Sequence, residues 1–505
     1  MTLTSTQRLT VVGAALTALF LGALDALIIS TAMPTVVADL GGLQLYSWVY
    51  SAYFLARAVS LPIFGKLADL YKCRRLFLGA ITLFLLASLL AGCAWDMTVL
   101  IVARVFQGIG AGAIFALVYI ILADVSTPGT RGRTLSIASS VWGIASVLGP
   151  TMGGVLVTYG SWRWVFFINV PMGLVSLWGI GRYFVDIRPK KEKVTLDWLG
   201  VATLSTAILA LLFALMLGGR TYAWSSWPIL VLLVLFVIGL SAFIRAERSA
   251  PDPILSIGFF TNKGFAAGNI AVFFSSFAIF SLFAFAPLFL QGVQERSPMQ
   301  VGVAMVSLSL GWSVGSVALG RFIDRLGLKS CAVAGALCLI GGCVMILSFT
   351  RSSSLSFSFS SFLTIGVGMG FVALSTLLVV QDWLEAKDLG VATSSNQFAR
   401  TLGGTVGVGV CGSFVAARFS DLTRIVRDSG ALAHLPGRLA EGGTGRIEEL
   451  LRPEILALLP QGLRDSLQQA VNRGTREVFW AVGASAVLCL AACLLIPKRS
   501  AGRSG

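Results

Sequence analysis

Long apolar runs separated by short polar loops make up most of the chain. Most runs have about 18–27 residues, and about 20 apolar residues in a helix cross the roughly 30 Å hydrocarbon layer of a bilayer. We predict fourteen such spans, at 10–33, 45–65, 76–94, 98–122, 135–158, 163–184, 197–218, 226–244, 265–290, 301–320, 330–349, 355–380, 390–416 and 477–497. Strands of a membrane barrel are only about ten residues long and alternate in polarity. The pattern therefore predicts an all-α integral membrane protein.

Charged residues are scarce and unevenly placed. Only 12% of the residues are charged, against about 25% in soluble proteins, so most of the surface must face lipid. The net charge of +15 arises from Lys and Arg in alternate loops, while the short loops between them hold only Arg163, Arg220, Arg296 and Arg351. Basic residues collect on the cytoplasmic side of membrane proteins. Both termini are therefore predicted to be cytoplasmic, and the positive charge does not indicate nucleic-acid binding.

The polarity of the middle of the chain divides it into three parts. Residues 185–195 form a polar joint after the sixth span, and the next two spans contain hardly any polar residues. We predict a six-helix bundle in 1–184, the joint with two inserted helices in 185–262, and a second six-helix bundle in 263–505. This second bundle includes an external loop at 417–476, with a Gly-rich centre at 442–445 and an amphipathic helix at 464–473.

A short basic turn occurs twice, at matching places in the two halves. In each copy a Gly ends an apolar run, an Asp follows four residues later, and basic residues come before the next run. The residues are Gly65, Asp69, Arg74 and Arg75 in the first copy, and Gly320, Asp324 and Arg325 in the second. Parallel internal repeats are common in membrane transporters.

Two ionisable residues lie deep in predicted spans, where a charged side chain costs about 2.5–3.5 kcal/mol. Asp25 is about 22 Å from the cytoplasmic start of the first span, and Arg104 is about 9 Å from the outer surface in the fourth, so their depths nearly coincide. We predict that they face each other across an internal cavity. A purely structural ion pair is one interpretation. A carboxylate that exchanges a proton or a cationic substrate is the other.

Five further polar residues are candidates for a substrate cavity. Arg57 and Arg400 are cations within spans, and each either lines the cavity or extends to the cytoplasmic face. Gln107, Asn269 and Gln381 offer hydrogen bonds either to a substrate or to a neighbouring helix.

Glycine-rich segments inside the spans indicate close helix packing. The segment 108–112 superficially matches a phosphate loop, but no strand precedes it, so packing through small residues is the better interpretation. Gly403, Gly404, Gly407 and Gly409 form a similar face. Gly149, Pro150, Gly153 and Gly154 predict a bend in the fifth span where helices of opposite halves approach closely.

The sequence lacks the usual components of an enzyme site. Most of its eight cysteines lie in apolar runs, no CxxC motif occurs, and His434 is the only histidine. No nucleophile elbow or phosphate loop is present either. We therefore predict no metal, no cofactor and no catalytic activity.

Six ordered motifs extend over nearly the whole chain: Asp25 with 29–34, then 65–75, 103–108, 149–154, 162–171 and 390–404. Together they resemble the fourteen-span drug:proton antiporters of the major facilitator superfamily. The resemblance implies two six-helix bundles that rock about a central site, with Asp69 holding the opposite half when the cytoplasmic side is closed. It also implies that a proton from outside neutralises Asp25, weakens its attraction for Arg104 or for a cation, and so drives export.

The sequence departs from the family pattern at Lys72, where a Gly is usual, and at Arg57, where a small or uncharged residue is usual. A cavity-facing Arg57 would favour anionic or zwitterionic cargo. The main hypothesis is a monomeric, proton-driven exporter of amphipathic compounds in the cytoplasmic (inner) membrane. A dedicated exporter of a lipid, amino acid or secondary metabolite is the alternative, and a non-transporting membrane sensor is a more remote one.

Overall fold

The computed structural model describes residues 5–40, 46–126, 128–186, 197–218, 222–250, 257–296, 298–385, 388–428 and 461–497. Nearly all of these residues are helical, as expected where lipid offers no hydrogen-bond partners to the backbone. The helices are α1 Ser5–Leu40, α2 Tyr46–Leu70, α3 Cys73–Gly92, α4 Met97–Val125, α5 Pro128–Tyr159, α6 Trp164–Phe167, α7 Asn169–Tyr183, α8 Trp198–Leu217, α9 Trp227–Ser249, the 3-10 helix η2 Ile257–Thr261, α10 Lys263–Gly292, α11 Pro298–Leu326, α12 Leu328–Leu347, α13 Leu355–Asp382, α14 Leu389–Asp428 and α18 Gln461–Leu495.

Several helices begin at a polar residue that caps the first turn. Asp96 accepts a hydrogen bond of 2.7 Å from the backbone N–H of Val99 at the start of α4. Asp197 does the same for α8, with a distance of 2.8 Å to the nitrogen of Gly200. These caps satisfy N–H groups that the helix itself leaves unpaired, and they set the ends of the apolar segments.

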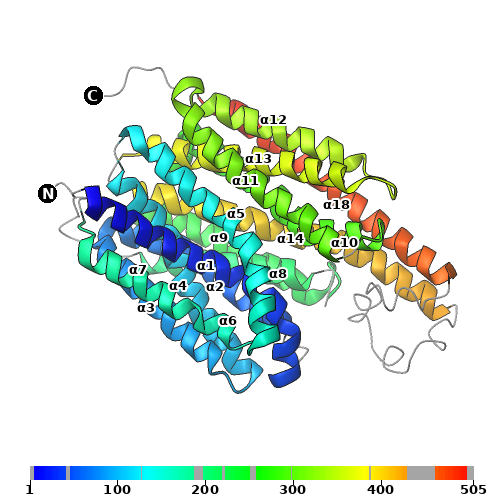
Figure 1. The fold of residues 1–505 in the computed structure, drawn as a ribbon. Helices are drawn as coiled ribbons and strands as arrows, with labels where there is room; N and C mark the ends of the chain where they lie inside the picture. Colours follow the sequence, from blue (N-terminus) through cyan, green and yellow to red (C-terminus); the bar gives the residue numbers. More distant parts are fainter. Residues whose placement is uncertain are drawn as a thin grey trace.

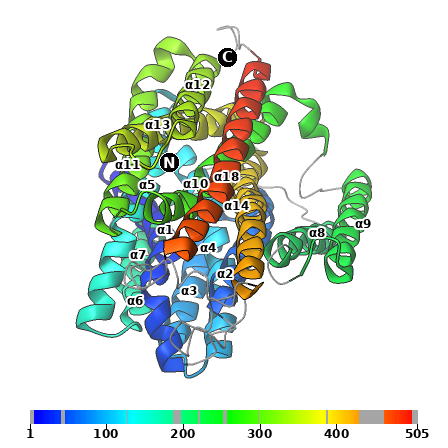
Figure 2. The same ribbon diagram turned by 90° about the vertical axis from the view of Figure 1, so that its right-hand side faces the viewer.

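The helices form two groups that lie side by side, with a separate pair at the edge. Helices α1–α7 pack on one another, and α10–α14 pack with α18 (Figure 1). Figure 2 shows α8 and α9 at the periphery, where α8 contacts α2 of the first group and α14 of the second. The side chains of Leu204, Ile208 and Leu212 on α8 join Leu55 and Ala58 of α2 in one apolar cluster.

Twelve helices in the described residues are long and apolar enough to cross a membrane. The predicted spans 45–65 and 135–158 are not among these twelve, although both are helical, in α2 and α5. The all-helical, multi-pass prediction is therefore confirmed, and the count of fourteen spans stays a prediction. The first turn of α1 and the last turn of α18 lie at the same end of the molecule in Figure 1, which fits an even number of crossings.

The largest difference from the predicted elements concerns the segment 417–476. Helix α14 continues to Asp428, and α18 begins at Gln461, so much of the predicted loop is helix. The predicted amphipathic helix at 464–473 is the first part of α18 rather than a separate element. The Gly-rich centre at 442–445 lies outside the described residues. Polar residues ended the predicted spans too early because a helix can continue beyond the hydrocarbon layer.

Candidate functional site

Asp25 and Arg104 form a direct ion pair inside the first group of helices. The distance from Asp25 Oδ2 to Arg104 Nη1 is 2.7 Å, and the two side chains are 1% and 0% exposed. The pair joins α1 to α4, as their equal predicted depths indicated. The prediction that a cavity separates Asp25 from Arg104 is wrong, because their atoms are in direct hydrogen-bond contact.

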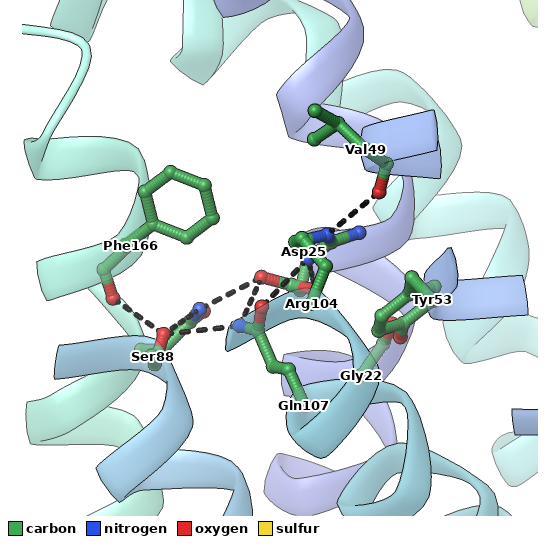
Figure 3. A network of polar contacts seen from close by, with 9 residues as sticks. Gly22, Asp25, Val49, Tyr53, Ser88, Arg104, Gln107 and Phe166 are labelled. Atoms are coloured by element: carbon green, nitrogen blue, oxygen red, sulfur yellow. Dashed lines mark hydrogen bonds and ion pairs between the residues drawn. The ribbon is translucent and has the colours of Figure 1, made fainter. Parts of the chain in front are cut away.

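Amide and hydroxyl groups surround the same carboxylate (Figure 3). Gln107 Nε2 and Asn169 Nδ2 donate to Asp25 Oδ1 over 2.8 and 2.9 Å. Both amides also donate to Ser88 Oγ, which in turn donates to the carbonyl of Phe166. The carboxylate thus accepts three hydrogen bonds, from α4 and α7, and the one from Arg104 has a charged donor.

Arg104 has further contacts beyond the carboxylate. Its Nη1 also donates to Gln107 Oε1 over 2.7 Å, and its Nε donates to the carbonyl of Val49 over 3.3 Å. The guanidinium lies 4.0 Å from the centre of the Tyr53 ring. Its Nη2 has no hydrogen-bond partner among the described residues. Most polar atoms of the network around Asp25 therefore have a hydrogen-bond partner. Nη2 of Arg104 remains available to donate if Asp25 becomes protonated.

Asp69 joins the two groups of helices at their basic end, the end that carries the turn 65–75. Its Oδ1 accepts from the backbone N–H of Gly390 over 2.8 Å, and its Oδ2 accepts from Val391 over 2.9 Å. The carboxylate therefore caps the positive end of α14. A Cβ on Gly65 would lie 1.9 Å from Ser394 Oγ, and one on Gly390 would lie 2.4 Å from the Gly65 carbonyl. Two glycines thus permit the close crossing of α2 and α14.

The second copy of the turn occupies a related position. A Cβ on Gly320 of α11 would lie 2.8 Å from Ser136 Oγ on α5, so this glycine also packs against the opposite group. The side chain of Asp324 lies outside the described part of the chain. Arg325 and Arg75 are exposed. Arg74 stays within its own group, with its backbone N–H near the Asp186 carboxylate and its guanidinium donating to the Gly181 carbonyl.

The structure changes the predicted role of the glycines in α5. A Cβ on Gly149 would contact Leu27 at 3.0 Å, on α1 of the same group, and Gly154 has open space around it. Gly153 is buried, and the side chain of Pro150 lies outside the described residues. The close approach to the opposite half occurs earlier, at Gly143, where a Cβ would lie 2.6 Å from the Ser309 carbonyl of α11. Gly149 follows Gly143 by six residues, so it lies on another side of the helix and contacts α1 instead of α11. The predicted contact with the opposite half is therefore not found at Gly149, and the predicted bend stays a prediction.

The other glycine patterns do pack helices, as predicted. Gly108 approaches the backbone of Tyr53, and Gly112 approaches the backbone of Arg57 on α2. Gly403 and Gly407 approach the backbone carbonyls of α10.

The five candidate cavity residues separate into two sets. Gln107 belongs to the Asp25 network. Gln381 donates to Thr393 Oγ1 over 2.8 Å, which joins α13 to α14, and Asn269 donates to the Phe265 carbonyl of its own helix. Arg57 and Arg400 are instead buried at the interface between the two groups, 6% and 5% exposed. Neither extends to the surface, so that interpretation is wrong.

Sequence reasoning did not single out Ser88, Tyr53 or the bonding role of Asn169. Asn169 occurred only within the motif 162–171, and a Ser or Tyr in an apolar run is common. The sequence marks these residues only as uncharged polar side chains within apolar spans. Such side chains indicate a functional site less strongly than charged ones do. Among the described residues no group of His, Cys, Asp and Glu is arranged to hold a metal ion.

The fold and these buried charges define a multi-pass helical membrane protein organised as two interacting bundles. A sequence profile of the Major Facilitator Superfamily matches residues 15–408, well over half of the chain. The chain therefore belongs to this superfamily of membrane transporters.

Its relatives are named as transporters and efflux pumps, not as enzymes. The chain is 34% identical to the multidrug transporter protein MdtP of Bacillus subtilis, over 96% of this chain and 93% of that protein. It is 32% identical to multidrug resistance protein 3 of the same organism, over 91% and 90%. It is also 32% identical to the efflux pump FUS6 of Gibberella moniliformis, over 88% and 82%.

Two solved structures share the fold. The human organic anion transporter MFSD10 superposes with a TM-score of 0.61, at 14% identity, over 94% of this chain and 99% of that one. A bacterial homologue of the human lysosomal transporter Spinster, inward-facing and unoccupied, gives 0.57 at 16% identity, over 98% of each chain. At these identities the likeness concerns the fold alone.

Proposed function

We propose that this transporter is a proton-coupled exporter of amphipathic compounds that works by alternating access, as a monomer, in the cytoplasmic membrane. The observation that carries the proposal is the carboxylate of Asp25, fully buried and bonded to Arg104. Protonation of Asp25 removes the negative partner of a buried cation. The pair is then far less favourable, and the helices α1 and α4 that carry it must rearrange or admit another anion.

The basic end supplies the second element of the cycle. We assign it to the cytoplasmic side because Lys and Arg are concentrated there. Asp69 bonded to the start of α14 then represents the state closed toward the cytoplasm. In this scheme a proton that reaches Asp25 from outside weakens the N-terminal bundle and favours release of the Asp69 contact. The names of the efflux relatives support export as the direction of transport.

The test is pH-gradient-driven transport in inside-out membrane vesicles whose lumen is acidified. Two amphipathic dyes are compared, a lipophilic cation and an amphipathic carboxylate, and Asp25→Asn is compared with the wild type. We expect gradient-dependent accumulation of at least one dye in the wild type and its loss in Asp25→Asn.

Asp39→Asn is the matched control. Asp39 lies on the same helix and forms an ion pair of 2.7 Å with Arg163, but its side chain is 48% exposed. This variant should transport as the wild type does. Gradient-dependent transport that survives in Asp25→Asn would refute the assignment of Asp25. A wild type that moves neither dye would instead favour the alternative, a dedicated exporter of one metabolite.

A further inference from the structure

Arg57 and Arg400 come from opposite groups of helices and lie near each other at their interface. Arg57 is on α2, and Arg400 is on α14, which crosses α2. Phe398 and Leu402, on either side of Arg400 in the sequence, share one apolar cluster with Leu55 and Ala58, on either side of Arg57. Helix α4 contacts both α2 and α14. The two cations therefore face a common region where α2, α4 and α14 meet.

Neither arginine has a negative partner among the residues that the structure describes. No carboxylate lies within 4.0 Å of either one in the part of the chain that the structure describes. Arg57 Nε has no hydrogen-bond acceptor there, and neither have Arg400 Nε and Nη1. Buried charges are normally paired, and buried guanidinium donors are normally satisfied. Arg104, by contrast, has its carboxylate, so the interface carries two uncompensated positive charges.

Aromatic rings lie close to both guanidinium groups. Arg57 lies 3.9 Å from the centre of the Phe115 ring and 5.2 Å from that of Trp142. Arg400 lies 5.9 Å from the centre of the Trp312 ring. A ring contacts the flat face of a guanidinium and leaves its N–H groups, which point along the edges, free to donate. The rings also provide apolar surface beside the charges.

We propose that Arg57 and Arg400 form a receptor for the carboxylate of an amphipathic substrate, whose apolar body packs against the aromatic rings Phe115, Trp142 and Trp312. A carboxylate matches the N–H geometry of a guanidinium and neutralises buried positive charge, whereas a lipophilic cation would add a third charge. Because the two arginines belong to different groups, a substrate between them also contacts both halves of the transporter. This inference rests on the proposed function and specifies its substrate class.

The test is equilibrium binding to the purified protein in nanodiscs of zwitterionic lipid, without a pH gradient. The probes are one rhodamine dye with a free carboxylate and the methyl ester of the same dye, which differ only in that group. We expect the wild type to bind the carboxylate form about tenfold or more tightly than the ester. Arg57→Gln and Arg400→Gln should each remove this preference while ester binding remains.

Arg182→Gln is the matched control, because Arg182 also lies near an aromatic ring, 5.5 Å from the centre of Tyr183, but is exposed. It should keep the preference, and Arg57→Lys should keep part of it through the retained charge. Equal or tighter binding of the ester by the wild type would overturn the proposal even if a variant failed to fold. A preference unchanged in both Gln variants would overturn it too. Because no gradient is used, this result is independent of whether Asp25 couples transport to protons.

Discussion

Asp69 and Gly390 are 321 residues apart in the chain, yet a hydrogen bond of 2.8 Å joins the carboxylate of one to the backbone N–H of the other. With the bond to Val391, it fixes the end of α2 against the start of α14. The contact needs a charged acceptor on one helix and a residue without a side chain on the other. The two parts can therefore be tested separately.

Asp69→Asn should weaken the closure of the basic end. The amide presents one acceptor in place of two charged ones, and hydrogen bonds to a charged group are worth about 1.5–3 kcal/mol. We expect Ser394→Cys, in a background without other cysteines, to react with a polar maleimide about tenfold or more faster when Asp69 is Asn. Asp186→Asn is the control, because Asp186 accepts from Arg74 within one group. Equal labelling of Asp69→Asn and the control would contradict the assignment.

Gly390→Ala tests the close approach of the two helices. Its Cβ would lie 2.3 Å from Asp69 Oδ1 and 2.4 Å from the Gly65 carbonyl, so α2 and α14 must separate. We expect faster labelling at Ser394→Cys and a lower melting temperature, because overpacking lowers the free energy of unfolding by about 1–3 kcal/mol. Gly341→Ala, which has nothing within 4 Å, should change neither measurement. A normal labelling rate in Gly390→Ala would show that the crossing can adjust.

Asn169→Ala should destabilise the protein and impair transport. It removes one of three donors to a buried carboxylate and leaves Ser88 without its bond of 2.8 Å. A lost buried partner of this kind is expected to cost about 1–3 kcal/mol. Asn269→Ala is the control, since that side chain donates only to its own helix among the bonds described for it. The comparison is made by thermal denaturation in detergent, and equal shifts for the two variants would contradict the prediction.

Glu295, three residues after the end of α10, accepts hydrogen bonds from Arg464 and Gln468 of α18. These contacts should weaken in acid. Burial acts to raise the pKa of Glu295, but the hydrogen bond from Gln468 and the charges of Arg464 and Arg351 hold it below its ordinary value of 4.5. A lowered pKa means that the stabilisation is present above pH 4.5 and is lost as the pH falls through the lower value. Glu295→Gln should therefore melt earlier than the wild type at pH 7, and the difference should vanish once the pH falls below the lowered pKa of Glu295.

The backbone of Glu295 offers a control for that measurement. Its φ is 52°, in the left-handed region that favours glycine. Glu295→Gly removes the charge but also removes the strain of a side chain at positive φ. It should therefore be less destabilising than Glu295→Gln at pH 7. Because each exposed ion pair is worth only about 0.2–1 kcal/mol, the two variants are best compared in parallel scans at low salt. A pH-independent difference from the wild type would contradict a role for the Glu295 charge.

Charged residues in apolar runs were the most predictable part of the site. Asp25 and Arg104 are costly in a span, so their depths alone indicated that they meet. Asn169 and Ser88 were not predicted, because an uncharged polar side chain can bond to its own helix and the sequence does not tell which choice it makes. Gln381 shows the same ambiguity: its bond to Thr393 serves helix packing, and no substrate contact follows from it.

The direction of a glycine face was harder to predict than its existence. Gly149 and Gly143 lie on one helix and both pack closely, yet one contacts α1 and the other α11. Which of them meets the opposite half depends on the rotation of α5 about its axis. That rotation is set by the packing of all the helices around α5, so it cannot be predicted from a local sequence motif.

Helix α8 touches α2 and α14 together, although these belong to different bundles. Any rocking that parts the two bundles along this seam must therefore slide at least one of them across α8. Its contact with Leu55 and Ala58 is made by apolar side chains, and apolar contacts are not directional, so they can shift more easily than hydrogen bonds. If the proposed alternating access involves such a movement, we expect α8 to stay in contact with at least one bundle and to cover this part of their interface.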